Sequence, residues 1–235
     1  MGRLAGLREH LRQLGAVDGS LYLANAVLRR ATGGRLHIVK YDLMVQPVRR
    51  EPLLPPHRGR NIRVHEAGRE DPLLMEAASR PVETLHTRFD AGARCLVASI
   101  DGEFAGFLWF QDGDYVEDEV RCVFRPEPPG AAVWDFDVYV APRHRLSPVF
   151  LKLWDEANRR LEADGVSHAC SRISAFNATS RAAHGRLGAA RAGWALFVCI
   201  GWCQFASASG GPVLHASGAS ARRPLVRVRP PAGQD

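Results

Sequence analysis

The sequence predicts an α/β protein (α+β mixed sheet) in which a central sheet is flanked by helices and preceded by an N-terminal helical extension. Two observations carry this prediction. From residue 61 onward, strand-like and helix-like segments follow the order β-α-β-β-β-α-β-α-β, which is typical of a mixed sheet with helices on both faces. Ahead of that series, leucines recur at helical spacing in residues 3–14.

The N-terminal part, residues 1–59, is expected to be an extension of two helices and a strand. The first helix ends at Gly15, and the second ends near Ala31, shortly before two consecutive glycines. Residues 36–48 are rich in Val, Ile and Tyr and therefore predict a strand. Three prolines within residues 52–60 indicate an exposed linker.

Residues 60–205 carry the α/β series and are expected to form the main domain. Strands are predicted at 61–66, 94–100, 103–110, 121–124, 131–140, 167–173 and 193–205, and helices at 71–88 with a break at Pro81, at 147–164 and at 178–187. Ser147 suits the N-cap of the helix that follows it, with Pro148 at the first helical position. Residues 206–235 are expected to add a strand at 225–228 and a flexible tail.

The charge pattern argues against nucleic acid and membrane partners. The formal net charge is +6, and since Lys40 and Lys152 are the only lysines, nearly all the positive charge is arginine. The arginines are scattered and not gathered with aromatic residues, so a nucleic-acid-binding face is not expected. Arginine excess with abundant Ala and Gly is typical of a GC-rich bacterial genome, and it favours an anionic ligand. No apolar run approaches the roughly 18 residues of a membrane span.

Cysteine usage indicates a reducing compartment. The five cysteines are Cys95, Cys122, Cys170, Cys199 and Cys203, an odd number without the C-x-x-C spacing of a zinc or redox site. The charged residues 1–15 do not resemble a secretory signal. We therefore expect a cytoplasmic protein with reduced thiols and no metal.

One predicted strand carries two carboxylates. In residues 133–140, strict alternation puts Asp135 and Asp137 on one face of an otherwise apolar strand. Buried carboxylates are costly unless they are paired or functional. Either they bind loop amides or arginines, or one of them is a general base whose pKa is raised by a partly dry cleft and a like-charged neighbour.

The chain leaves this strand through a basic turn. Residues 141–146 lead to the predicted helix N-terminus at Ser147, where free backbone N–H groups and the helix dipole favour an anion. Arg143, His144 and Arg145 add positive charge to the turn. A phosphate-rich cofactor would fit there.

A second segment, residues 177–189, places polar groups at fixed helical offsets. Asn177, Ser180 and His184 stand at offsets 0, +3 and +7, which share one face of a helix. A histidine in that position could donate a proton to a leaving thiolate. The alternative is that Asn177 caps the helix and His184 is a surface or core residue.

The two segments together resemble the GNAT acyltransferase superfamily, and the resemblance spans about residues 61–204. The spacing of the superfamily's N-x-x-A-x-x-x-Y-x-K-x-G-F block is matched by Asn177, Ser180, His184, Arg186, Gly188 and Ala189, and its V-x-V-x-P strand by Val138, Val140 and Pro142. The two blocks also follow one another in the superfamily's order.

The resemblance implies a splayed mixed sheet that binds acetyl-CoA. In the superfamily, the backbone of the strand binds the pantetheine arm and the basic turn holds the pyrophosphate. On this basis the cofactor-binding residues are expected to be Val138, Val140, Arg143, His144, Arg145, Leu146, Ser147, Asn177 and Ser180. At the position of His184 the superfamily usually has a tyrosine, thought to protonate the departing CoA thiolate. Asp135 or Asp137 would then remove the amine proton.

Three departures from the superfamily's pattern bear on chemistry. Pro148 and Phe150 stand where the phosphate-binding turn normally has small residues, and proline has no N–H to donate. His184 replaces tyrosine, and its lower pKa would shift the pH optimum. Ala189 replaces a phenylalanine that packs in the superfamily.

We therefore expect an N-acetyltransferase that moves acetyl from acetyl-CoA directly to an amine of a small molecule. One alternative is a long-chain acyltransferase that takes its acyl group from an acyl-CoA or an acyl carrier protein. A second alternative is a non-catalytic ligand-binding domain of the same fold. A homodimer remains open as an assembly.

Overall fold

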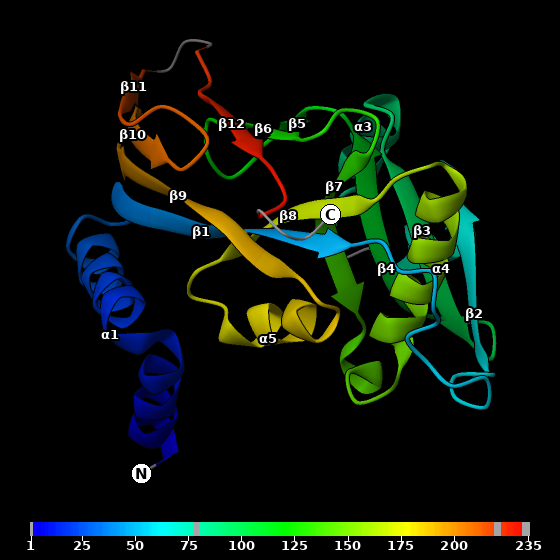
Figure 1. Cartoon of the computed structure of the whole chain (residues 1–235). Helices are drawn as coiled ribbons and strands as arrows, with labels where there is room; N and C mark the ends of the chain where they lie inside the picture. Colours follow the sequence, from blue (N-terminus) through cyan, green and yellow to red (C-terminus); the bar gives the residue numbers. More distant parts are fainter. Residues whose placement is uncertain (1, 78–79, 219–221, 232–235) are drawn as a thin grey trace. The chain divides into compact units, whose positions relative to one another are not determined.

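The computed structural model of the chain describes residues 2–77, 80–218 and 222–231 (Figure 1). It divides into two compact units built from alternating stretches of the sequence: unit 1 comprises Met1–Gln46, Asp114–Glu127 and Cys170–Asp235, and unit 2 comprises Pro47–Gly113 and Pro128–Ala169. Each unit combines strands with helices, which confirms the predicted mixed α/β class. The predicted division into consecutive parts at residues 59 and 205 stays a prediction. Residues 232–235 of the predicted flexible tail lie outside the described residues.

Unit 2 is built on antiparallel strands in the order β7-β4-β3-β2. These strands are β2 (Ile62–Ala67), β3 (Arg94–Ile100), β4 (Glu103–Asp112) and β7 (Ala132–Val140). The helical elements of the unit are α2 (Pro72–Ala77), α3 (Val82–Asp90), the short 3-10 turn η1 (Pro142–His144) and α4 (Val149–Ala163). Pro81 stands at the N-cap of α3, so the predicted break in the helical segment is confirmed.

Helix α4 buries an apolar stripe at helical spacing. The stripe comprises Val149, Leu153, Ala157 and Leu161, each at most 1% exposed. The helix begins later than the sequence predicted, because Pro148 and not Ser147 occupies the N-cap. The Ser147 hydroxyl instead donates to the carbonyl of His144 at 2.7 Å and accepts from the N–H of Val149 at 3.4 Å.

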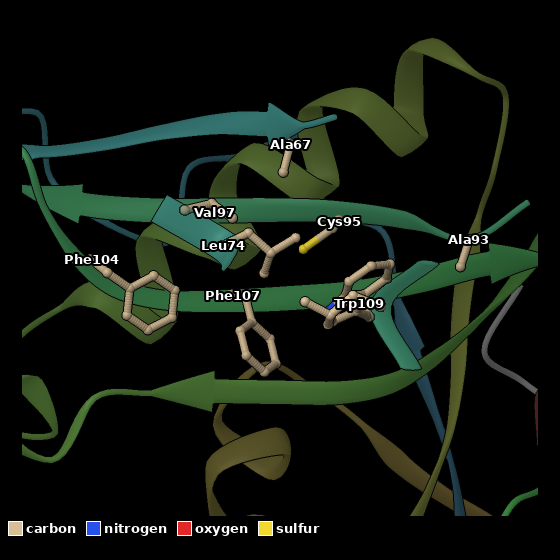
Figure 2. Packing of buried hydrophobic residues seen from close by; sticks show 9 residues of the cluster. Ala67, Leu74, Ala93, Cys95, Val97, Phe104, Phe107 and Trp109 are labelled. Atoms are coloured by element: carbon tan, nitrogen blue, oxygen red, sulfur yellow. The ribbon is translucent and has the colours of Figure 1, made fainter. Parts of the chain in front are cut away.

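A second apolar cluster lies against β4, along which Phe104, Phe107 and Trp109 are arranged (Figure 2). Leu74 of α2 and Leu85 of α3 are fully buried in this cluster, at 0% exposure. Burial of each such side chain stabilises the fold by about 1.5–3 kcal/mol. The short helices α2 and α3 are therefore held by packing on β4, since neither is long enough to be stable alone.

Unit 1 contains strands in the order β11-β10-β9-β1-β8 and a smaller sheet in the order β12-β6-β5. The bounds of the first set are β1 (Leu36–Pro47), β8 (His168–Ser174), β9 (Ala190–Ile200), β10 (Cys203–Ala208) and β11 (His215–Ser217). Those of the second are β5 (Tyr115–Val116), β6 (Val123–Pro126) and β12 (Leu225–Val228). The helices are α1 (Gly2–Ala31) and α5 (Ala178–Arg186).

Two segments of unit 1 that were predicted as strands differ in how they pair. The single strand predicted at 193–205 is wrong: the segment forms the hairpin of β9 and β10, with a turn at Gly201, which has φ 56°. The strand predicted in the N-terminal part is present as β1, and it lies between β9 and β8 inside the sheet. The N-terminal part thus supplies an interior strand to unit 1.

Helix α1 is two helices joined at a kink, as predicted. Gly15 has φ 76° and ψ 178°, a conformation that interrupts the helix and that glycine adopts readily. Beyond the kink, Asp18 pairs with Lys40 on β1, and Asn25 Oδ1 accepts the N–H of Ile38 at 2.8 Å. These polar contacts fix the second half of α1 on β1.

Three further features concern the thiols, membrane-spanning helices and metal-binding groups. All five cysteines are free thiols, and four of them are buried. Within the described residues, no helix combines the length and apolar character needed to cross a bilayer. The same residues hold no group of three or more His, Cys, Asp and Glu side chains suited to a metal ion.

Gly106 on β4 tests how closely the elements of unit 2 are packed. A Cβ at this position would lie 2.5 Å from the carbonyl oxygen of Tyr139 and 3.2 Å from Val149. We expect Gly106→Ala to lower the free energy of unfolding by about 1–3 kcal/mol, as overpacking does, and Tm by several degrees. Gly68→Ala is the matched control, because a Cβ there meets nothing within 4 Å. Equal Tm values for the two variants would contradict the register of β4 and β7.

Candidate functional site

A β-bulge interrupts the strand that carries the two carboxylates. Asp137 lies opposite Trp109 and Asp135 lies opposite Phe110, so Phe136 is an extra residue on β7. Consecutive residues of β4 face opposite sides of the sheet. Asp135 and Asp137 therefore lie on opposite faces, and the prediction that they share one face is wrong. Strict alternation holds only in a regular ladder, and the bulge shifts it by one residue.

Asp137 is engaged by two arginines. Its Oδ2 atom lies 3.0 Å from Arg80 Nη2 and 2.8 Å from Arg88 Nη1. The guanidinium of Arg88 also lies 5.2 Å from the ring centre of Trp109 and 5.1 Å from that of Phe136. These contacts favour the first alternative, a carboxylate that binds arginine, over a general base.

Asp135 lies on the other face of β7. Asp135 is 4% exposed, and its cross-strand neighbour Phe110 is 1% exposed. On this face Arg94 stacks over Phe110 at 5.0 Å and pairs with Asp164, the C-cap residue of α4, at 2.7 Å. Asp135 is thus placed in the interior on the α4 side, away from the face that carries Asp137.

After the bulge, β7 offers backbone groups at a defined edge. Ala141 donates its N–H to the carbonyl of Ala105 on β4 at 2.9 Å. In an antiparallel ladder, successive residues alternate between bonding one neighbour and pointing to the opposite edge. Tyr139 therefore bonds β4, whereas Val138 and Val140 direct their N–H and C=O groups to the other edge. The structure thus gives Val138 and Val140 the backbone orientation that a ligand running along β7 would need.

The basic turn uses several of its own amides. His144 donates its N–H to the carbonyl of Ala141 at 2.8 Å, Arg145 to that of Pro142 at 3.4 Å, and Ser147 to that of His144 at 2.9 Å. The N-cap residue of α4 is Pro148, which has no N–H. The free amides expected for an anion at this turn are therefore fewer than the sequence predicted.

The side chains of the turn retain its positive charge. Arg143 Nη2 donates to the carbonyl of Phe104 at 3.1 Å and pairs with Glu103 at 2.9 Å, while its Nε donates to His144 Nε2 at 3.0 Å. Arg145 and Leu146 are exposed. An anion at this turn would rest mainly on guanidinium groups.

In the second segment, the structure favours the alternative roles. Asn177 is the N-cap of α5, and its side chain accepts the N–H of Ser180 at 3.0 Å. His184 is a core residue at 5% exposure. Burial lowers the pKa of His184 to about 4, so its ring is neutral at pH 7. A neutral imidazole is a poor proton donor to a thiolate.

The predicted site residues fall into two groups. Val138, Val140, the turn and both carboxylates belong to unit 2, and the three residues of the second segment belong to unit 1. Within unit 2 the structure brings the strand and the turn together as expected and separates the two carboxylates. Their roles toward a cofactor stay predictions.

A cavity that the sequence did not predict lies beside β7. A space of about 670 Å³ is bordered by residues that include Glu103, Phe104, Tyr139 and Arg143. The stacked rings of Phe104 and Tyr139 are 6.2 Å apart between centres. Only the pairing of β4 with β7 brings these residues together, so no local pattern could have revealed the cavity.

Comparison with known proteins gives fold relatives at low identity. No protein-family model matches the chain, and no curated protein matches it. A solved protein of unknown function from Staphylococcus epidermidis is 12% identical with a TM-score of 0.51, over 74% of this chain and 65% of that chain. A tandem GNAT protein from the clavulanic acid biosynthesis pathway is 18% identical with a TM-score of 0.44, over 71% of this chain and 55% of that chain. An aminoglycoside N-acetyltransferase in complex with CoA is 18% identical with a TM-score of 0.41, over 57% of this chain and 91% of that chain.

These likenesses concern the fold. The chain spans 65% of the first of these structures and 55% of the second. The likeness to the Staphylococcus epidermidis protein, at 12% identity, shows a shared fold and no activity. The similar structures include GNAT N-acetyltransferases, the superfamily that the two motifs resemble, but TM-scores below 0.5 carry no argument about what this chain binds.

The pair of Asp137 and Arg88 can be tested by stability. We expect Asp137→Asn to lower the free energy of unfolding by about 2–4 kcal/mol, because it leaves the largely buried Arg88 without its counter-charge. Arg80→Ala should cost less than about 1 kcal/mol, since the side chain of Arg80 is 46% exposed. Chemical denaturation measures both. A harmless Asp137→Asn would show that the carboxylate does not hold the bulge.

The burial of His184 predicts a pH dependence of stability. Its pKa falls from the usual 6.5 to about 4 on folding, so the unfolded chain binds the additional proton. The stability contribution is complete above about pH 6.5 and is lost as pH falls toward 4, on the order of 3 kcal/mol in all. His184→Gln should flatten this part of the profile, whereas the exposed His57→Gln should not. Identical profiles for wild type and His184→Gln would contradict the burial.

Proposed function

We propose that the chain is an acyltransferase that moves an acyl group, acetyl in the simplest case, from a CoA thioester to an amine of a small molecule. One observation carries the proposal: after its bulge, β7 directs the backbone of Val138 and Val140 to one edge and then enters a basic turn at the start of α4. A ligand with amide groups and a phosphorylated end matches that sequence of features.

The pantetheine arm supplies the amide groups. It contains two amides, so it can form backbone-like hydrogen bonds with the N–H and C=O groups of Val138 and Val140. Such pairing would fix the thioester relative to β7. Asn177 and Ser180 stay predicted cofactor contacts through their motif, besides the capping bond that joins them.

The phosphate groups would be held mostly by side chains. Three amides of the turn donate within the turn, so Arg145 would supply much of the attraction, with His144, Leu146 and Ser147 shaping the loop. Arg143 adds positive charge to the turn while its Nη2 atom is directed at Glu103 and Phe104. Guanidinium groups bind phosphate in two-pronged geometry. This arrangement differs from a glycine-rich cradle and makes recognition depend on arginine.

Positioning is the main contribution to rate in this proposal. His184 is neutral at pH 7 and is therefore a poor proton donor, and the carboxylate of Asp137 is held in ion pairs with Arg80 and Arg88. His184 stays a catalytic candidate through its place in the motif, and Asp135 and Asp137 stay candidates as the two carboxylates of the strand. Holding a deprotonated amine against the thioester can by itself lower the barrier by several kcal/mol.

Free thiols and the CoA donor support a cytoplasmic location.

A carrier-protein donor is the second candidate. The small number of available amides in the turn favours it, because an acyl carrier protein presents pantetheine without the nucleotide half of CoA. An excess of arginine over acidic residues would suit its acidic surface.

Calorimetric titration with acetyl-CoA and with acetyl-pantetheine tests the proposal. Arg145→Ala should weaken acetyl-CoA binding roughly tenfold and leave the phosphate-free acetyl-pantetheine unchanged, because the lost contact is to phosphate. The exposed Arg49→Ala is the control and should bind both as wild type does. Absence of acetyl-CoA binding by wild type at millimolar concentration would overturn the CoA proposal. Equal binding of both ligands would favour the carrier-protein donor.

A further inference from the structure

The cavity beside β7 has the size of a small-molecule site. It measures about 670 Å³ and is bordered by Leu73, Glu103, Phe104, Tyr139, Pro142 and Arg143, among others. Sites for small ligands usually measure about 300–1,000 Å³ and combine an apolar wall with a few polar groups. This cavity has both components, and all its residues belong to unit 2.

The apolar wall is built from aromatic rings that pack on one another. Tyr139 stacks on Phe104 with ring centres 6.2 Å apart and lies 5.5 Å from the ring of Phe107. Phe104 and Phe107 are buried in the cluster against β4 (Figure 2). Leu73 packs against the same cluster from α2. An alkyl or aromatic group in the cavity would therefore meet a preformed surface.

The polar component is a pair of opposite charges. Arg143 Nη2 lies 2.9 Å from Glu103 Oε2, and the two side chains are 56% and 70% exposed. Arg143 is tied to the cavity by its bond to the carbonyl of Phe104 at 3.1 Å. An exposed ion pair is weak, so the two groups can exchange each other for the charges of a ligand.

The geometry points to a site for the head group of an α-amino acid. The carboxylate would bind Arg143, the ammonium would bind Glu103, and the side chain would lie over Phe104 and Tyr139. A zwitterion pairs with Arg143 and Glu103 at once. A simple amine or a simple carboxylate pairs with one of them, and the other then competes with the ligand for its former partner. The opposite charges on one side and the apolar wall on the other match this class of ligand.

With the proposed function, the site also identifies the reacting amine, and this part of the inference rests on that proposal. An ammonium held by Glu103 has no lone pair for attack. Asp137, at the bulge, lies two residues before Tyr139 on the same face, roughly 7 Å along the strand. Pantetheine paired with Val138 and Val140 would bring its thioester to the bulge, and a four-carbon side chain spans the distance to it. We therefore infer that the acceptor is a diamino acid such as lysine. Its neutral side-chain amine attacks the thioester carbonyl, the C–N bond forms, the C–S bond breaks, and the proton that the amine loses neutralises the CoA thiolate.

Binding of three probes without any acyl donor tests the site. L-norleucine carries both head charges and a four-carbon side chain, hexanoate lacks the ammonium, and n-pentylamine lacks the carboxylate. We expect L-norleucine to bind at least tenfold more tightly than either of the others. Glu103→Gln and Leu73→Trp should each weaken L-norleucine tenfold, the first by removing a charge and the second by filling the cavity.

Matched controls are available on α3. Glu83→Gln makes the same change and Val82→Trp makes a comparable one at exposed positions, and both variants should bind L-norleucine as wild type does. Equal binding of the three probes, no binding of L-norleucine at 10 mM, or wild-type binding by Glu103→Gln and Leu73→Trp would overturn the site.

Acetyl-CoA titrated in parallel separates the two proposals. Acetyl-CoA binding without L-norleucine binding overturns this inference and leaves the proposed function standing. L-norleucine binding without acetyl-CoA binding supports the site and contradicts the CoA donor. When both bind, mass spectrometry of L-lysine incubated with acetyl-CoA and the protein should show acetyl on the side-chain nitrogen. Acetylation of the α-nitrogen would overturn the assigned orientation.

Discussion

The bulge at Phe136 is the constraint on which the candidate site depends. Arg88 holds it in three ways, because its guanidinium lies over Trp109 and Phe136 and pairs with Asp137. The extra residue decides which face of the sheet each later side chain of β7 lies on, and which side of β7 each later backbone group faces. Without it, the backbone groups of Val138 and Val140 would turn toward β4, and the ring of Tyr139 would lie on the α4 face. The ligand-facing edge and the aromatic wall of the cavity both follow from one inserted residue.

A network of charges has a comparable role in unit 1. Arg181 of α5 pairs with Asp42 of β1 at 2.9 Å and with Asp18 of α1 at 3.4 Å, and Arg191 of β9 also pairs with Asp42 at 2.9 Å. Asp42 is 2% exposed, and its ion pairs with Arg181 and Arg191 compensate the cost of burying its charge. The network fixes α5, and with it the capping bond of Asn177, on the strands of unit 1.

Much of the fold could be predicted from the sequence, because local patterns decide it. The kink at Gly15 and the break at Pro81 follow from residue types at single positions, and the strand at 94–100 follows from a short apolar run. The faces of Asp135 and Asp137 could not be predicted, since the bulge is a property of the pairing with β4. The burial of His184 likewise depends on packing from distant segments. In the candidate site, the strand and turn were predictable by motif, whereas the engaged amides and the cavity were not.

The central claim is that a pantetheine thioester binds along β7 through the backbone of Val138 and Val140. Residue-resolved amide exchange, measured by NMR with and without saturating acetyl-CoA, tests it most directly. The account predicts that the amides of Val138 and Val140 exchange more slowly with acetyl-CoA bound, while that of Tyr139, already bonded to β4, changes little. Binding of acetyl-CoA with no change at Val138 and Val140 would contradict it.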